Sequence, residues 1–91
     1  ALLDEVVSVL KSRPTMTVEI QGHTDERGKL QWNMTLSKNR AESVLKYLTS
    51  HGVGPERLKS DGFGPTKPIC TEKTAACYDK NRRTQFLVTH Q

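Results

Sequence analysis

The segment GHTDERG at residues 22–28 concentrates groups that could do chemistry: a histidine, two adjacent acids and an arginine between two glycines. A metal site here would use His23 and Asp25, but alternate residues of a loop offer only two ligands. Neither an HExxH motif nor a cysteine-rich motif accompanies them in the sequence. We therefore predict no metal site in this segment.

Catalysis is the second kind of chemistry that these residues could support. A nucleophile, base and orienting acid could be drawn from Ser37, His23 and Asp25, but the GxSxG turn that usually carries such a serine is missing. Asp25 and Glu26 are neighbours in the chain, so their side chains normally point apart and make a poor acid–base pair. We predict no catalytic residues, no cofactor and no enzymatic activity.

Ligand binding uses more of the sequence. Asn33, Ser37 and Arg40 are spaced by four and three, which places them on one face of a helix. Asp25 lies in the loop that leads into this helix, so its carboxylate could approach Arg40. Such a pair could receive a zwitterion, with the acid binding an ammonium and the arginine a carboxylate. The simpler alternative is a surface salt bridge between them, worth about 0–1 kcal/mol.

Hydrophobic periodicity predicts the elements that position these residues. Leu2 to Leu10 recur at helical spacing up to Pro14, and TMTVEIQG then alternates as a strand with Met16, Val18 and Ile20 on its buried side. A long helix follows over about 30–51, with Gly52 suited to its C-terminal end. Its expected sheet-facing stripe includes Leu36, Val44 and Leu48.

The remaining segments predict a strand over 57–64, a short helix over about 75–80 and a closing strand in RRTQFLVTH. This order predicts an α/β (α+β) two-layer sandwich in which the helices pack on one face of a small mixed β-sheet. Residues 1–91 are expected to form one domain. Because the chain opens directly on a helical pattern, we expect a fragment of a longer protein.

Composition narrows the class of partner. The net charge is +4, but the basic residues are spread along the chain, which favours a solvated surface over a nucleic-acid interface. No apolar stretch is long enough to span a membrane, so any membrane contact would come from an upstream anchor. Cys70 and Cys77 lie seven positions apart, which fits a disulfide in an oxidising compartment better than a zinc pair.

Four motifs together resemble one known family. They are GHTD, then N-x-x-L-S-x-x-R-A, then G-x-G-x-x-x-P, then N-R-R, distributed between Val18 and Phe86. The combination resembles the C-terminal domain of the outer membrane protein A family. The segments TDERG and YDKNRR make it most similar to the subgroup of the peptidoglycan-associated lipoprotein. Domains of this family normally begin with a strand before the first helix, so the first strand is expected to be missing here.

The resemblance implies a domain that binds peptidoglycan at the periplasmic face of the outer membrane or cell envelope. By motif position, Asp25 and Arg40 would clasp the diaminopimelate of the stem peptide. The same transfer places supporting contacts at Thr24, Asn33 and Arg82. An alternative is that the same fold binds another envelope protein instead of the wall.

Several other residues inside these motifs are expected to have structural roles. His23 is expected to be a hydrogen-bonded structural histidine, and Trp32 is expected to pack on the domain. Gly22, Gly62 and Gly64 are expected to serve backbone geometry.

Overall fold

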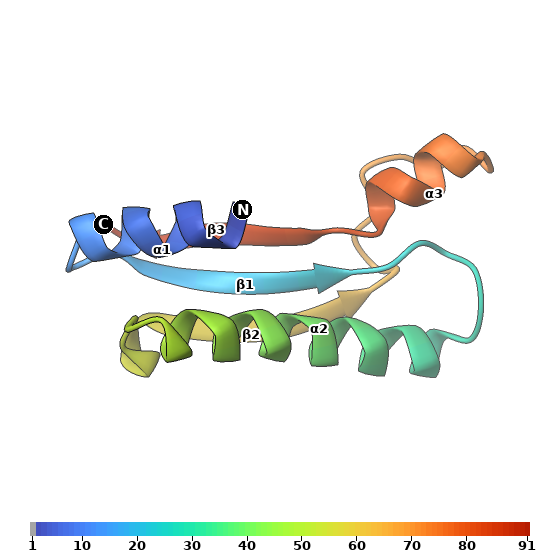
Figure 1. The fold of residues 1–91 in the computed structure, drawn as a ribbon. Coiled ribbons are helices and arrows are strands. Elements are labelled where there is room, and N and C mark those ends of the chain that lie inside the picture. The colour runs from blue at the N-terminus through green and yellow to red at the C-terminus, as the bar shows by residue number, and fades with distance from the viewer. Residues whose placement is uncertain (1) are drawn as a thin grey trace.

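The computed structural model describes residues 2–91, and its elements follow the predicted order (Figure 1). They are α1 (Leu2–Ser12), β1 (Thr17–His23), α2 (Leu30–Ser50), the 3-10 helix η1 (Pro55–Arg57), β2 (Leu58–Gly64), α3 (Ala75–Asn81) and β3 (Thr84–His90). The last strand begins two residues later than predicted, because Arg82 ends α3 instead of starting the strand.

The three strands form one mixed sheet in the order β2-β1-β3. β1 runs parallel to β2 and antiparallel to β3, with Ile20 opposite Ser60 on one side and Phe86 on the other. Helices α1 and α2 lie across the same face of this sheet, and α3 lies beyond the end where β1 leads into its loop (Figure 1). The predicted two-layer arrangement of helices on a small mixed sheet is confirmed.

The core lies between the two long helices and the sheet. Val18 and Ile20 of β1 are buried, whereas Thr17, Glu19 and Gln21 between them are half-buried, as the alternating pattern predicts. Buried apolar residues from α1, α2 and two loops pack around them, and Leu58 of β2 and Phe86 of β3 add partly buried side chains. The buried set is Val7, Leu10, Met16, Val18, Ile20, Ala41, Leu48 and Val53.

Helix α2 packs unusually close to the sheet because two strand residues lack side chains. A Cβ atom on Gly22 would overlap the carbonyl oxygen of Ser37, and one on Gly62 would overlap the backbone of Lys38. Gly64 adopts a φ of 54°, which a residue with a side chain rarely takes. The predicted structural roles of these three glycines are confirmed.

The Cys70–Cys77 disulfide closes the loop that leads into α3, as predicted, with Cα atoms 5.9 Å apart. The Asn81 side chain reinforces this loop, donating to the Cys70 carbonyl at 3.1 Å and accepting from the Ile69 N–H at 2.9 Å. Together these links hold the loop and the C-terminal end of α3 as one unit.

Within residues 2–91, none of the helices combines the length and the apolar character that crossing a membrane would require.

Candidate functional site

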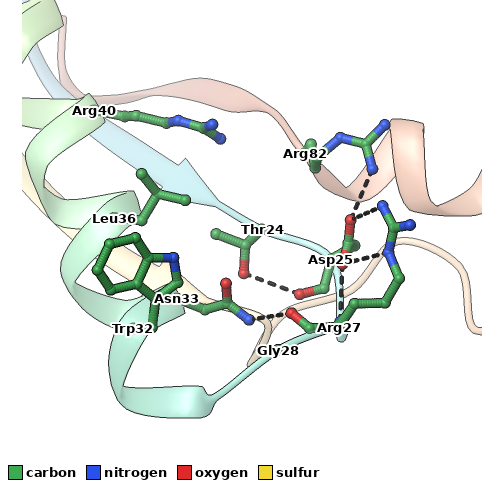
Figure 2. A pocket seen from close by; sticks show the side chains of 9 residues that line it. All are labelled: Thr24, Asp25, Arg27, Gly28, Trp32, Asn33, Leu36, Arg40 and Arg82. Atoms are coloured by element: carbon green, nitrogen blue, oxygen red, sulfur yellow. Dashed lines mark hydrogen bonds and ion pairs between the residues drawn. The ribbon is translucent and has the colours of Figure 1, made fainter.

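A cavity of about 370 Å³ opens between the loop after β1 and the exposed side of α2 (Figure 2). We call it the Asp25 pocket. Its lining residues are Thr24, Asp25, Arg27, Gly28, Trp32, Asn33, Leu36, Arg40 and Arg82. All five residues that the motifs suggested for ligand contact therefore lie around one cavity, although they are spread over 59 positions of the sequence, from 24 to 82.

Three segments bring these side chains together. The loop after β1 supplies Asp25, successive turns of α2 supply Asn33 and Arg40, and the end of α3 supplies Arg82. Arg82 reaches the site because β3 pairs antiparallel with β1. Backbone hydrogen bonds between His23 and Arg83, at 2.9 and 3.3 Å, extend this pairing by one residue beyond Thr84, where β3 begins. The beginning of the last strand is thereby held beside the loop that carries Asp25.

Asp25 is buried, with 6% of its surface exposed, and its carboxylate accepts four hydrogen bonds. Oδ1 accepts from the backbone N–H of Arg27 at 2.8 Å and from its Nε–H at 3.2 Å. Oδ2 accepts from Arg27 Nη2 at 2.9 Å and from Arg82 Nη1 at 2.7 Å. The hydrogen bonds from Arg27 are the main cause that holds the pKa of Asp25 well below its usual range. The hydrogen bond from Arg82 lowers this pKa further, whereas burial acts in the opposite direction and raises it. Asp25 is therefore an anion at neutral pH.

Arg27 is a pocket residue that the sequence analysis missed. Its guanidinium bridges Asp25 and the ring of Tyr78, which lies 4.3 Å from the guanidinium carbon. A signal was present in the sequence, because aspartates in loops often bond the backbone two residues later, and Arg27 follows Asp25 by two. Gly28 was missed as well, and Leu36 lines the pocket although we expected it to pack on the sheet.

Arg40 lies on the other side of the pocket, on the exposed surface of α2, and Figure 2 shows its side chain extended along the cavity. Among residues 2–91, no acid forms an ion pair with it. The alternative of a direct Asp25–Arg40 salt bridge is wrong, because Asp25 pairs with Arg27 and Arg82 instead. The cavity separates the anion of Asp25 from the cation of Arg40.

Thr24 and Asn33 shape the loop between these two charges. Thr24 Oγ1 donates to the carbonyl of Asp25 at 3.0 Å, and Asn33 Nδ2 donates to the carbonyl of Arg27 at 2.7 Å. Both side chains are buried, and the oxygen of the Asn33 amide points into the cavity (Figure 2). Asn33 therefore holds the loop against α2 through its amide N–H, and its amide oxygen remains available to the cavity as a hydrogen-bond acceptor.

Two sequence expectations about α2 fail at this site. Ser37 does not face the cavity with Asn33 and Arg40, because it is fully buried against the sheet, where its Oγ accepts from the N–H of Gly64 at 2.9 Å. Trp32 does not pack on the domain, since 67% of it is exposed at the rim of the Asp25 pocket. The close packing of α2 at Gly22 turns the face with Ser37 inward and leaves Trp32 outside.

The charges of the pocket lining are unbalanced. Arg27, Arg40 and Arg82 contribute three positive charges and Asp25 one negative charge, which leaves +2 around the cavity. Such a lining attracts an anionic group, while the buried carboxylate keeps one place for a cation. The only His, Cys, Asp and Glu cluster with metal-ligand spacing among residues 2–91 is Cys70, Glu72 and Cys77, whose two sulfurs are already joined in the disulfide.

His23 is the last residue of β1, does not line the Asp25 pocket, and has the structural environment that we expected. It is 2% exposed and stacks on Phe63 with ring centroids 5.4 Å apart. Its Nε2 lies 3.4 Å from Gln21 Oε1, while Nδ1 has no hydrogen-bond partner among the described residues. Burial, with the positive charges of Arg83 and Lys67, lowers the pKa of His23 to about 4.

We expect His23 to make the protein less stable as the pH falls from about 6.5 to about 4. In this window the unfolded chain binds a proton on His23 that the folded protein excludes, so acid favours unfolding by on the order of 2 kcal/mol. Urea unfolding at pH 7.5 and pH 4.5 measures the effect, which His23→Gln should largely remove. His51→Gln, at an exposed histidine, is the control and should keep the wild-type pH dependence. An unchanged pH dependence in His23→Gln would contradict the assignment.

The chain is similar to known proteins over most of its length. The profile of the OmpA family matches residues 1–82. Outer membrane protein A of Bordetella avium is 39% identical over 87 residues, covering 96% of this chain and 45% of the relative. The peptidoglycan-associated lipoprotein of Rhizobium meliloti is 35% identical over 83 residues, covering 91% of this chain and 47% of the relative. The chain thus spans about half the length of these curated relatives.

Solved structures show the same fold. The peptidoglycan-associated lipoprotein from Burkholderia pseudomallei superposes with a TM-score of 0.91 at 35% identity, covering 97% of this chain and 75% of that one. The C-terminal domain of Helicobacter pylori MotB superposes with a TM-score of 0.88, covering 99% of this chain and 70% of that one. At 24% identity, the MotB likeness supports the fold alone.

Proposed function

The chain belongs to the OmpA family, and on that premise we propose that it binds peptidoglycan through the diaminopimelate of the stem peptide. The family consists of structural domains and not of enzymes, in agreement with the predicted lack of catalysis. Relatives named peptidoglycan-associated lipoproteins support the choice of the wall as partner. The chemistry of the pocket supports the choice of diaminopimelate.

The observation that carries the proposal is the separation of charges across the Asp25 pocket. The free end of diaminopimelate has an ammonium and a carboxylate on one carbon atom. Asp25, buried and ionised, would receive the ammonium. The guanidinium of Arg40, which pairs with no acid of residues 2–91, would bind the carboxylate. Thr24, Asn33 and Arg82 would complete the hydrogen bonds, and the net positive lining would attract the ligand's carboxylate.

This binding would act in the envelope. We propose that the domain works on the periplasmic side of the cell envelope, where it tethers the outer membrane or an envelope complex to the wall. The names of the relatives and the Cys70–Cys77 disulfide, a bond typical of oxidising compartments, support this location.

A second candidate function is binding of another envelope protein by the same fold. An apolar hollow of about 290 Å³ between α1 and β3 favours it, because Leu2, Val9 and Val88 are exposed there. Free diaminopimelate would compete with a ligand in the Asp25 pocket and would leave a protein bound at this hollow in place.

Two stem peptides test the role of Arg40. One contains diaminopimelate, and the other contains lysine, which keeps the ammonium and lacks the carboxylate. Arg40→Ala should weaken binding of the diaminopimelate peptide by about tenfold to a hundredfold, as expected for loss of charge-assisted hydrogen bonds. It should leave the affinity for the lysine peptide unchanged. Isothermal titration calorimetry with both peptides measures this difference.

Arg13→Ala is the matched control for Arg40→Ala, because Arg13 is also an exposed arginine but follows α1 and lies outside the pocket lining. It should bind both peptides like the wild type. Equal affinity of the wild type for the two peptides would refute the assignment of the carboxylate to Arg40. If the wild type bound neither of the two peptides, the proposed function would be refuted.

A further inference from the structure

The carboxylate of Asp25 has no open acceptor position in the free protein. Each oxygen already accepts two hydrogen bonds, and three of the four donors belong to Arg27. A carboxylate offers about four acceptor positions in all. A ligand ammonium can therefore bind Asp25 only if one of these donors leaves.

The side chain of Arg27 is the donor best able to leave. It is 57% exposed, whereas the side chain of Arg82 is 37% exposed and makes a second ion pair, with Asp79 at 3.3 Å. The backbone N–H of Arg27 bonds Asp25 independently of its side chain, so the loop keeps its anchor when the guanidinium moves. Asn33 holds the same loop through the carbonyl of Arg27 at 2.7 Å.

The ring of Tyr78 can hold the guanidinium of Arg27 after it has left Asp25. Its ring already lies 4.3 Å from the guanidinium carbon of Arg27. A cation over an aromatic ring is stabilised without any bond to Asp25. Arg27 could therefore give up both of its side-chain hydrogen bonds and retain this contact.

We propose that the guanidinium of Arg27 occupies, in the free protein, the subsite on Asp25 that the ammonium of the ligand takes on binding. This inference rests on the proposed function of the Asp25 pocket. The exchange replaces one cation by another, so the buried carboxylate stays neutralised throughout. A neutral group would leave Asp25 with Arg82 as its remaining cationic partner, whereas an ammonium restores the second one, which makes Arg27 a determinant of specificity for a cationic ligand.

The exchange has a measurable cost in affinity. While Arg27 holds the subsite, only the fraction of molecules in which it has moved away can accept the ammonium. Removing the competing side chain should therefore strengthen binding, opposite to the usual effect of deleting an arginine from a binding pocket.

The test compares the wild type with Arg27→Ala and Arg27→Gln by calorimetric titration with the diaminopimelate stem peptide. Both variants should bind about two- to fivefold more tightly, the range expected for removing an exposed ion pair that competes with the ligand. Arg82→Ala is the contrasting variant, because Arg82 donates to the same oxygen but belongs to the proposed binding set; it should bind more weakly. Because the Arg27 side chain is largely exposed, both replacements should leave the fold intact, which circular dichroism checks.

A second readout follows Arg27 directly. In the wild type, the Nε–H resonance of Arg27 should shift during titration as its bond to Asp25 breaks, while the backbone N–H of Arg27 stays hydrogen-bonded.

The outcomes separate this inference from the proposed function. If both Arg27 variants bind the peptide with the same affinity as the wild type or more weakly, the inference is refuted and the proposed function still stands. Absence of binding by all of the proteins refutes the proposed function and the inference together. Tighter binding by both variants, with a shifted Nε–H resonance in the wild type, supports the exchange.

Discussion

Asp25→Asn is expected to weaken binding of the diaminopimelate stem peptide by about a hundredfold or more. The ammonium of the ligand would lose its anionic partner in a buried position, and deleting one member of such a pair costs about 2–5 kcal/mol in affinity. The amide also adds two donors that face Arg27, Arg82 and the ammonium, all of which are donors themselves. Asparagine has the same shape as aspartate, so the effect reports charge and hydrogen bonding and not packing.

Calorimetric titration measures the affinity, and urea unfolding measures the accompanying loss of stability. The two arginines that pair with Asp25 remain partly solvated, so we expect the variant to stay folded at 25 °C. Asp61→Asn is the matched control, because Asp61 lies on β2 outside the pocket lining and should bind the peptide like the wild type. Wild-type affinity in a folded Asp25→Asn protein would show that Asp25 does not receive the ligand.

Gly22→Ala is expected to destabilise the fold by about 3 kcal/mol or more. The new methyl group would overlap the carbonyl oxygen of Ser37, which belongs to the backbone of α2 and cannot rotate away. The helix would have to lift from the sheet and break the hydrogen bond from the N–H of Gly64 to Ser37 Oγ. Because α2 also carries Asn33 and Arg40, the same movement would distort the pocket.

Gly54→Ala is the control for this substitution. At Gly54 the nearest atoms to a new Cβ belong to the end of the flexible Glu56 side chain, which can rotate, and the φ of −62° suits alanine. Urea unfolding followed by circular dichroism should show a large loss for Gly22→Ala and a small change for Gly54→Ala. Equal unfolding midpoints for Gly22→Ala and the wild type would mean that α2 is not held as closely to β1 as the structure indicates.

The position of Arg82 depends on the disulfide-closed loop and α3 before it. The disulfide and the side chain of Asn81 hold the loop to α3, and the ion pair of Lys73 with Glu26, at 2.9 Å, joins this region to the loop that carries Asp25. Arg82 then pairs with Asp25 at the end of the same helix. The loop with the disulfide is thus connected to the proposed site through α3, although neither cysteine lines the Asp25 pocket.

Sequence pattern was enough to predict the layers of this fold. The alternation of Val18 and Ile20 with polar residues, and the helical spacing of Val7 and Leu10, follow from which side of each element is buried. Motif position likewise placed Asp25 and Arg40 near one another, because a strand, a short loop and a helix can connect in few ways. These are local properties, and each can be read from spacing along the chain.

The partners of Asp25 could not be read in this way. Arg82 reaches it only because β3 returns antiparallel to β1, and Arg27 turns back on it through a loop conformation that depends on Asn33. The exposure of Trp32 and the burial of Ser37 depend on the rotation of α2, which its contact with Gly22 sets. Long charged side chains have many rotamers and several possible partners, so their pairing follows from distances in the folded protein and not from separation along the chain.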